Sequence, residues 1–495
     1  MANLTLTYIN AALMKVTSDD EATEKNLQDY LTFDAPGAKY MPAKRGGWWD
    51  GKVRLYNLRT HAIYTGLAWK IAQWAHERRH TILWRDWPLI QAIVPQAERL
   101  AFIQTLQLSL VPREFQLHAL WTAIEAGRSI AVLPTASGKS LVLYMLARWY
   151  LSLNEDKDSP NRILFVVPTI QLVSQLAKDI SEYGYTGIVH QVKAGTTKSN
   201  SLANLTVSTW QSIYKESPSY FQQYTTVICD ECHLFKSKAI VEMMGKMPTI
   251  NSRHGFSGTL DGTAVHELTL EGVFGPITKS VTTAALIDLG IISPLEIHQV
   301  ILRHSGDVPT QIAKDYAEEI RYLCAHRARN MFIKKLAFSL SGTTLVLFNL
   351  VEAHGLVLHQ LIKDHAENNG LRPVYYISGQ TSGNQREIIR AIIAAKDDAI
   401  LVASYGCLST GVNLPHIENV IFASPSKSRI RVLQSIGRGL RLAPGKTRCR
   451  IYDIADEIAL GRRRNFTFAH AKLRREYYVS EQLPMKTYNV SLGGS

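Results

Sequence analysis

The chain contains few cysteines and no long hydrophobic run. Only 5 of its 495 residues are cysteine, which is too few, and an odd number, for a disulfide-stapled secreted fold. No run of about 18 apolar residues occurs, and the opening MANLTLTYIN lacks the basic and apolar regions of a signal peptide. We therefore expect a soluble intracellular protein with reduced thiols and no membrane partner.

Acidic residues are also scarce relative to basic ones. Asp and Glu number 42 against 55 Lys and Arg, which gives a formal net charge of +13. Such an excess suits a partner with a long run of phosphates, although an ordinary solvated basic surface would give the same sum. Charge alone is therefore compatible with nucleic-acid binding but does not establish it.

Cys229 and Cys232 have the spacing of a redox pair or of half a zinc site. No second CxxC pair and no HxxxH motif follows them to complete four ligands. We therefore do not expect a metal bound to these thiols.

The hydrophobic pattern predicts two α/β domains in tandem. Residues 1–105 read as a small N-terminal α/β domain, and short apolar runs that alternate with amphipathic stretches follow it. Such runs are typical of buried parallel strands in a doubly wound sheet. The runs are SIAVLP, RILFVVP, LTVST and TVICD over 106–290, then TTLVLFN, VYYIS, AILVAS, NVIFAS and CRIYDI over 291–460.

The last segment, 461–495, is basic and aromatic and shows no strand pattern, so we expect a helical tail. Its cations could grip DNA, pack on the second α/β domain, or do both. A run of charge is more often a solvated face than a binding site. The cations concerned are Arg462, Arg463, Arg464, Lys472, Arg474 and Arg475.

A phosphate-binding loop is predicted where the strand SIAVLP meets the helix LVLYMLARWY, the context that a P-loop requires. Loop amides and the helix N-terminus can cradle phosphates. We expect Lys139 to reach the β- and γ-phosphates and the Ser140 hydroxyl to ligate Mg²⁺. The loop comprises Pro134, Thr135, Ala136, Ser137, Gly138, Lys139 and Ser140.

Two carboxylates follow the apolar strand TTVICD, about ninety residues after the loop. They would lie at the carboxyl edge of the same predicted sheet. Asp230 can hold Mg²⁺, and Glu231 can polarise the attacking water. A phosphate loop with this companion predicts ATP hydrolysis.

The sequence Asp230-Glu231-Cys232-His233 and an ordered series of motifs resemble the superfamily 2 helicases of the DExH group. The resemblance implies two RecA-like domains that use ATP and Mg²⁺. It implies that Arg113 and Gln116 contact the adenine. It assigns coupling of hydrolysis to domain movement to His233, Ser257 and Thr259, and contacts to the nucleic-acid backbone to Thr169, Gln175, Thr209, Trp210 and Gln211.

Motifs of the same family occur in the second α/β domain. The segment STGVN is similar to a motif with both ATP and strand contacts, in Thr410, Gly411 and Asn413, although the family often has Asp where Asn413 stands. Gln434 to Arg441 matches the family's QxxGRxxR motif. Arg438 and Arg441 would neutralise charge on the γ-phosphate, a contribution of about 10³-fold or more in related hydrolases, and Gln434 would contact ATP.

The segment GGWWDGKVRL, ahead of this core, narrows the resemblance to the UvsW helicase family of T-even phages, over nearly the entire chain. Two tryptophans beside basic residues could stack on bases and attract phosphates, or they could fill the core of a small domain. The sequence leaves both roles open. The residues are Arg45, Trp48, Trp49, Lys52 and Arg54.

The resemblance implies an ATP-dependent DNA helicase that remodels forks, Holliday-type junctions and R-loops in phage recombination, repair and replication. Its partners would be single-stranded and branched DNA, with RNA in R-loops and a single-strand-binding protein as further candidates, in the host cytoplasm. An RNA helicase or a translocase that does not unwind would share the core motifs. A binding protein with a decayed ATPase, and the motor of a restriction complex, are further alternatives.

Overall fold

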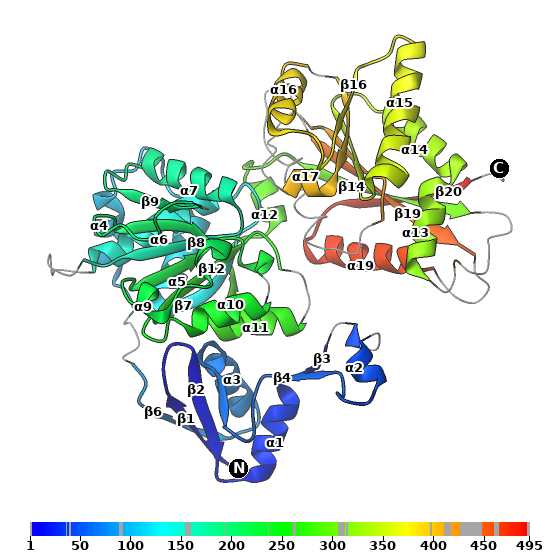
Figure 1. Ribbon diagram of the computed structural model, residues 1–495. Helices are drawn as coiled ribbons and strands as arrows, with labels where there is room; N and C mark the ends of the chain where they lie inside the picture. Colours follow the sequence, from blue (N-terminus) through cyan, green and yellow to red (C-terminus); the bar gives the residue numbers. More distant parts are fainter. Residues whose placement is uncertain are drawn as a thin grey trace. The chain divides into compact units, whose positions relative to one another are not determined.

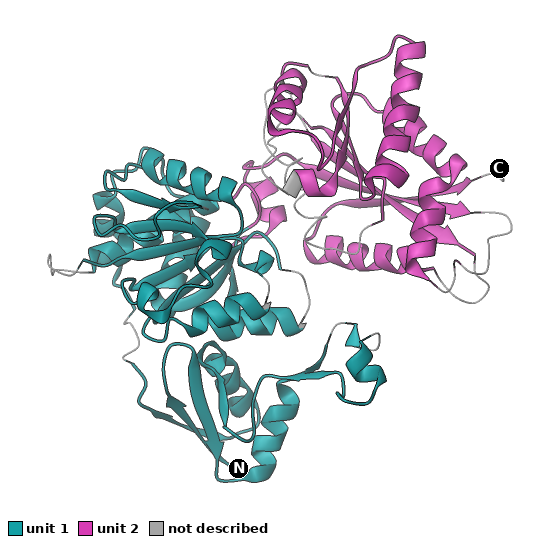
Figure 2. Ribbon diagram, viewed as in Figure 1, with its two compact units in different colours: residues 1–133, 138–280 teal, residues 134–137, 281–495 magenta. Residues whose placement is uncertain are grey.

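The chain forms two compact units, residues 1–133 with 138–280 and residues 134–137 with 281–495 (Figure 2). Each unit contains its own seven-stranded sheet. The computed structural model describes residues 2–35, 37–38, 41–88, 93–153, 160–193, 195–235, 237–260, 264–304, 312, 315–396, 398–409, 417–425, 448–459 and 465–492.

The sheet of the first unit is parallel throughout, in the order β13-β7-β12-β11-β8-β10-β9. The four predicted strands, β7, β8, β10 and β11, are confirmed. Three more were missed because they are short or carry polar residues, as in the SRHGFS of β12. The strands are β7 Arg128–Val132, β8 Ile163–Val167, β9 Val189–Val192, β10 Leu205–Thr209, β11 Thr226–Cys229, β12 Ser252–Ser257 and β13 Ile277–Lys279.

Helices cover both faces of this sheet (Figure 1). The helix after the phosphate loop, α6, is apolar nearly all round and is buried along most of its length, as expected of a helix inside the fold. The helices are α4 Gln96–Thr105, α5 Glu114–Ala126, α6 Lys139–Ser152, α7 Ile170–Glu182, α8 Trp210–Ile213, α9 Pro218–Phe221, α10 Ser237–Gly245 and α11 Ala264–Phe274, with the 3-10 turn η3 Cys232–Leu234.

The N-terminal region is α/β, as predicted. Its four-stranded sheet has the order β5-β2-β1-β6, and β3 and β4 form a separate antiparallel pair that leads to α2, an arm that projects from the body (Figure 1). The elements are β1 Asn3–Tyr8, β2 Leu13–Ser18, α1 Glu21–Tyr30, β3 Thr32–Asp34, α2 Pro42–Arg45, β4 Lys52–Arg54, β5 Ala62–Tyr64, η2 Thr65–Leu67, α3 Ala68–Glu77 and β6 Thr81–Arg85.

The N-terminal region packs directly on α11 within the first unit. Leu268 of α11 joins the N-terminal core, and the Lys70 ammonium lies 3.1 Å from the Glu271 carboxylate. The partly buried Arg128 guanidinium donates to the Ala11 carbonyl at 3.1 Å. A Cβ at Gly66 would collide with the Glu271 carbonyl, so only glycine allows this approach. The N-terminal four-stranded region and the first seven-stranded sheet therefore belong to one packed body.

The sheet of the second unit is also parallel, in the order β16-β17-β15-β18-β19-β14-β20. All five predicted strands, β15 to β19, are confirmed. The strands are β14 Leu295–His304, β15 Thr344–Phe348, β16 Val374–Ile377, β17 Ile400–Ser404, β18 Asn419–Phe422, β19 Cys449–Ile458 and β20 Met485–Leu492. The helices are α12 Thr283–Asp288, α13 Tyr316–Ala325, α14 Arg327–Ser339, η5 Val351–Gly355, α15 Leu356–Asn368, α16 Gly383–Ala394, α17 Tyr405–Ser409 and α19 Phe466–Ser480.

The expectation that the C-terminal segment has no strand was wrong. A helix, α19, is present, but β20 follows it and pairs with β14 over eight residues. The strand was missed because it is an edge strand whose residues are mostly exposed, so MKTYNVSL lacks a strong apolar pattern. Arg474 of α19 is buried against Asp453 of β19, with 2.6 Å between Nη2 and Oδ1, so this cation packs on the domain.

Candidate ATPase site and nucleic-acid groove

The predicted phosphate loop connects β7 to α6 and contains two residues in the left-handed region. Gly138 has φ of 78° and Ala136 has φ of 68°. A Cβ at Gly138 would collide with the Gln116 side-chain amide, so glycine is needed there for space as well as for conformation. Ala136 adopts a conformation that costs a non-glycine residue about 1 kcal/mol or more. Such strain is typical of functional loops.

Lys139 meets both predicted carboxylates. Its Nζ lies 2.7 Å from Asp230 Oδ1 and also donates to Glu231 Oε1. Asp230 and Glu231 follow β11 directly, and β11 is separated from β7 only by β12, so the loop and the carboxylates meet at one edge of the sheet. Glu231 has φ of 48°, a third left-handed residue at the site. The sequence prediction that these groups converge is confirmed.

The three charges change one another's titration. Burial opposes charge on Lys139, but the neighbouring carboxylates outweigh it and raise the lysine pKa. Burial, with repulsion from Glu231, raises the pKa of Asp230. Burial also opposes charge on Glu231, but Lys139 and His233 outweigh it and lower its pKa. Glu231 is thus the carboxylate that stays ionised, as polarisation of a water molecule requires.

The predicted coupling residues also come together. His233 Nδ1 lies 2.7 Å from Ser257 Oγ and 3.3 Å from Glu231 Oε2. The Thr259 N–H donates to Ser257 Oγ at 3.0 Å. A path of polar contacts therefore runs from the Glu231 carboxylate through His233 to Ser257, the last residue of β12, and on to Thr259.

Sequence reasoning missed Tyr183, whose hydroxyl lies 2.9 Å from Ser140 Oγ. Tyr183 follows α7, and nothing in its sequence context marks it as part of the site. Ser140 and Asp230 offer a hydroxyl and a carboxylate, the oxygen ligands that Mg²⁺ prefers, so the donor set fits this ion. Among the described residues, no group of three or more His, Cys, Asp or Glu side chains is placed to hold a metal ion.

Gln116 is buried at the start of α5, and its Oε1 accepts from the Arg113 N–H at 2.8 Å. This bond fixes the amide beside Gly138 of the phosphate loop. The adenine contact itself stays a prediction. The Gln116 side chain is thus held in contact with the phosphate loop.

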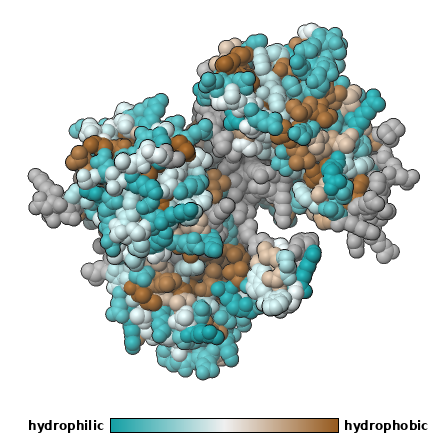
Figure 3. All heavy atoms as spheres, in the orientation of Figure 1, coloured by the Kyte–Doolittle hydropathy of each residue, from teal (hydrophilic) through white to brown (hydrophobic). Residues whose placement is uncertain are grey.

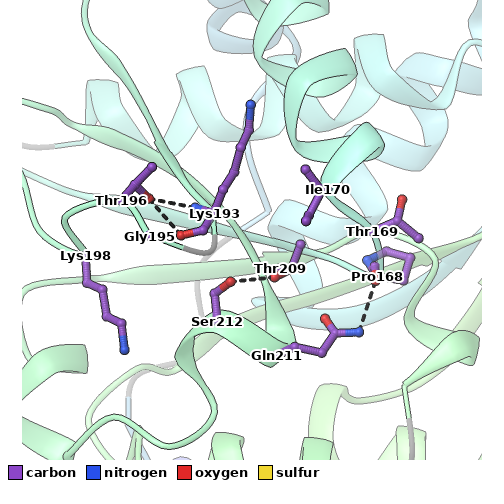
Figure 4. Close-up of a pocket in the computed structure, with 10 residues that line it drawn as sticks. All are labelled: Pro168, Thr169, Ile170, Lys193, Gly195, Thr196, Lys198, Thr209, Gln211 and Ser212. Atoms are coloured by element: carbon purple, nitrogen blue, oxygen red, sulfur yellow. Dashed lines mark hydrogen bonds between the residues drawn. The ribbon is translucent and has the colours of Figure 1, made fainter. Parts of the chain in front are cut away.

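A separate cavity of about 640 Å³ lies at the carboxyl ends of β8 and β10 (Figure 4). Thr169, Thr209 and Gln211, three of the predicted strand-contacting residues, line it, and Gln211 Nε2 donates to the Pro168 carbonyl at 3.2 Å. Pro168 and Ile170, beside Thr169, and Ser212, beside Gln211, also line the cavity. The other lining residues were not predicted, since no motif marks the segment after β9. They are Lys193, Gly195, Thr196 and Lys198.

The other two predicted strand contacts do not line this cavity, which we call the groove. Gln175 is on the exposed side of α7, where its amide donates to Asp179 at 2.6 Å. The Trp210 ring packs on Tyr214, with 5.6 Å between centroids, and against the core. The structure therefore brings three of the five residues together.

The two tryptophans of the arm, Trp48 and Trp49, differ in exposure and in their contacts. Trp48 is 89% exposed and so fills no core. Trp49 is half-buried, and its Nε1 donates to the Lys52 carbonyl at 2.9 Å, which fixes the turn. Arg54 pairs with Asp50, whereas Arg45 and Lys52 are exposed. The visible face of the arm is mostly pale to teal in Figure 3, with little strongly apolar surface.

Predicted site residues of the second unit lie outside the described residues. They are Thr410, Gly411, Asn413, Gln434, Arg438 and Arg441, together with the tail cations Arg462, Arg463 and Arg464.

Comparison with known proteins bears directly on this geometry. The chain matches the family models described as DEAD/DEAH box helicase over residues 113–268, helicase conserved C-terminal domain over 329–443, and DNA helicase UvsW, N-terminal, over 4–85. It is 30% identical to the ATP-dependent DNA helicase uvsW of Enterobacteria phage T4, over 95% of this chain and 97% of the phage protein. The chain belongs to the UvsW helicase family.

Solved structures agree with this membership. The crystal structure of T4 UvsW matches with a TM-score of 0.52 and 27% identity, covering 99% of this chain and all of that one. A fragment of a putative HsdR subunit from Vibrio vulnificus matches with a TM-score of 0.58 at 19% identity, over 80% of this chain and 72% of that one, which shows the shared fold alone. The chain is an ATP-hydrolysing helicase with UvsW-type organisation. No helix among the described residues is long and apolar enough to cross a membrane.

Proposed function

We propose that the protein unwinds and remodels branched DNA, including forks, Holliday-type junctions and R-loops, in phage recombination, repair and replication in the host cytoplasm. The observation that carries this proposal is that one sheet holds both a lysine–carboxylate cluster and a lysine-lined groove at its carboxyl edge. The Lys139 cluster follows β7 and β11, and the groove follows β8 and β10. Similarity to a phage DNA helicase over nearly the whole chain supports DNA as the substrate.

In the ATPase site, Lys139 exchanges its carboxylate partners for the β- and γ-phosphates. Ser140 and Asp230 would hold Mg²⁺, and the ion would supply positive charge beside the phosphates. Glu231 then polarises the attacking water, and His233, which also lowers the Glu231 pKa, remains beside it when Lys139 contacts the phosphates. His233, Ser257 and Thr259 relay the change at Glu231 to the end of β12. Arg113 and Gln116 select the adenine.

In the groove, Lys193 and Lys198 attract backbone phosphates, while Thr169, Thr209 and Gln211 donate hydrogen bonds to them. Contacts to the backbone position a strand without reading its sequence. We therefore expect recognition of DNA structure and not of base sequence. Thr410 of the second unit would add a contact, and Arg438 and Arg441 would complete the ATPase site when ATP draws the two RecA-like domains together.

The N-terminal region, 1–105, acts as a nucleic-acid-binding domain through the arm. An indole that is 89% exposed offers a stacking surface to an unpaired base, and Arg45 and Lys52 supply charge beside it. The body of this N-terminal region packs on α11, so we expect that body to move with the first helicase domain. A single-strand-binding protein and RNA strands within R-loops are further partners that this arrangement allows.

ATP turnover by the purified chain and by Lys139→Ala tests the proposal, measured with no nucleic acid, single-stranded DNA, forked DNA and RNA of equal length. We expect stimulation by forked and single-stranded DNA, abolished in Lys139→Ala. Stimulation by RNA alone would favour an RNA helicase. Stimulation by DNA without strand separation would favour a translocase, and no stimulation at all would leave a binding protein.

A further inference from the structure

The amino ends of three adjacent strands in the second unit carry aromatic and basic side chains. The register of β14, β19 and β20 sets His298 between Tyr452 and Lys486. The His298 ring stacks on Tyr488 with 5.6 Å between centroids and 4° between planes, and its centroid lies 5.0 Å from that of Tyr452. We name these residues the aromatic–basic patch, which comprises His298, Tyr452, Tyr488, Arg448, Arg450 and Lys486.

The patch lies on the face of the sheet opposite α19. Gln299 and Ile301 of β14 point to α19, because Gln299 Nε2 contacts the Ala471 carbonyl at 3.4 Å and Ile301 packs on the Ala455–Phe468–Ala471 cluster. Side chains alternate along a strand, so His298 points to the other face. On that face the α14 residues Ile333 and Ala337 pack against the strands farther along, whereas Tyr488 remains 43% exposed.

The charge of the patch is positive. Glu296 is the carboxylate that pairs with Arg448 at 3.5 Å and with Arg450 at 3.7 Å, and it lies 3.4 Å from His298 Nε2. Three cations therefore face one carboxylate in the part of the chain that the structure describes. The two arginine pairs are long and a third to a half exposed, so they contribute little to stability and can yield to a phosphate.

We propose that the aromatic–basic patch is a second binding site for single-stranded DNA. Exposed aromatic rings on β-strands with flanking cations are the arrangement with which proteins stack bases and hold the adjoining phosphates. A base would stack on the Tyr488 ring, whose other face stacks on His298. The cations Arg448, Arg450 and Lys486 would bind the phosphates of the backbone. The patch is at the amino edge of the sheet, whereas nucleotide chemistry in parallel sheets occurs at the carboxyl edge. A strand held here would therefore lie at the edge opposite to the one where nucleotides bind.

Photocrosslinking tests this site directly. The full chain is irradiated with a single-stranded DNA oligonucleotide that contains 5-iodouracil, and the crosslinked peptides are mapped by mass spectrometry. We expect a crosslink at Tyr488 in addition to crosslinks in the groove or the arm. Crosslinks confined to the groove and the arm would overturn the proposal, as would a Tyr488 crosslink obtained with RNA and never with DNA.

Binding by variants gives a second test. Tyr488→Ala should weaken binding of single-stranded DNA by about 5- to 20-fold, as expected for one stacked base, and Tyr488→Phe should bind normally. Thr487→Ala, on the opposite face of β20, is the matched control. Lys486→Ala should lower the slope of log affinity against log salt by about 0.7.

Thermal unfolding should show that these variants remain folded. Unchanged binding by Tyr488→Ala would overturn the proposal. The inference rests on the proposed DNA substrate, and the two can fail separately. If the substrate is wrong, the unaltered chain binds no DNA; if only the patch is wrong, Gln211→Ala weakens DNA binding and Tyr488→Ala does not.

Discussion

Lys139 in the first unit and Arg329 in the second are both cations held by carboxylates inside a parallel α/β domain. The side chains of Lys139, Asp230 and Glu231 are 16%, 12% and 24% exposed, whereas those of Arg329 and Asp456 are 0% exposed. Arg329 donates to both Asp456 oxygens, at 2.8 and 3.0 Å, and to the Ala423 carbonyl at 2.7 Å. The first cluster can exchange a partner for a phosphate or water, and the second cannot.

Backbone conformation separates the two clusters further. Ala136, Gly138 and Glu231 are all left-handed, whereas Arg329 and Asp456 lie within regular elements, α14 and β19. Strained backbone conformations of this kind cluster at functional sites, where the surrounding structure enforces them. Buried charge alone therefore does not identify an active site; accessibility and strained backbone beside the charge do.

The largest effect should come from Lys139→Ala. We expect ATP turnover to fall by about 10³-fold or more, because the transferring phosphate loses its cation. The free energy of unfolding should change little, since solvent reaches the two carboxylates and one of them can take up a proton. Turnover assays and urea unfolding measure the two quantities. A large loss of stability would show that the site cluster is structural, like the Arg329 cluster.

Arg329→Leu should behave in the opposite way. It leaves Asp456 buried without its guanidinium partner, which costs about 3–5 kcal/mol of stability. Burial raises the Asp456 pKa, but Arg329 and His304 outweigh burial and lower it to about 2. Without Arg329 this pKa should rise. Urea unfolding checks the loss, and the double variant Arg329→Leu/Asp456→Leu should recover part of it. A stable but inactive Arg329→Leu protein would contradict the comparison.

Gly138→Ala separates the two reasons for glycine in the loop. It should abolish ATP binding, because the new Cβ meets the Gln116 amide in addition to the unfavourable φ. Gly127→Ala is the control, since Gly127 has φ of 65° but open space around it, and it should cost only about 1 kcal/mol of stability. Titration with a fluorescent ATP analogue measures the affinity. Equal effects of the two substitutions on ATP binding would show that steric contact is unimportant.

Trp48→Ala should have the smallest effect on the fold. We expect binding of forked DNA to weaken by about 5- to 100-fold through the loss of one stacking surface, without a change in stability. Trp74→Ala provides the contrast, because Trp74 is buried in the N-terminal core and its loss should cost about 3–5 kcal/mol. Fluorescence anisotropy and thermal unfolding distinguish them. Normal DNA binding by Trp48→Ala would remove the arm from the interface.

The sequence predicted those strands and site residues that a short stretch of the chain specifies by itself. Runs such as ILFVV are apolar throughout, which favours buried strands. Asp230 and Glu231 follow such a strand directly, and Lys139 follows another after a short loop. Tyr183, Lys193 and Lys198 were not predictable, because the chain fold alone brings them to the site. The strand β20 was missed because its exposed residues carry no apolar periodicity. The sequence leaves open whether Arg474 binds DNA or packs on the second domain, and its buried partner Asp453 shows that it packs on the domain.

Strand separation by Glu231→Gln is the most direct test of the account. The substitution keeps the shape of the side chain and removes the charge that polarises water. With ATP, Mg²⁺ and a forked DNA duplex, the unaltered chain should separate the strands. Glu231→Gln should bind both ATP and the fork normally but leave the duplex intact. Equal strand separation by the two proteins would contradict the claim that ATP hydrolysis at this sheet edge drives the unwinding of DNA.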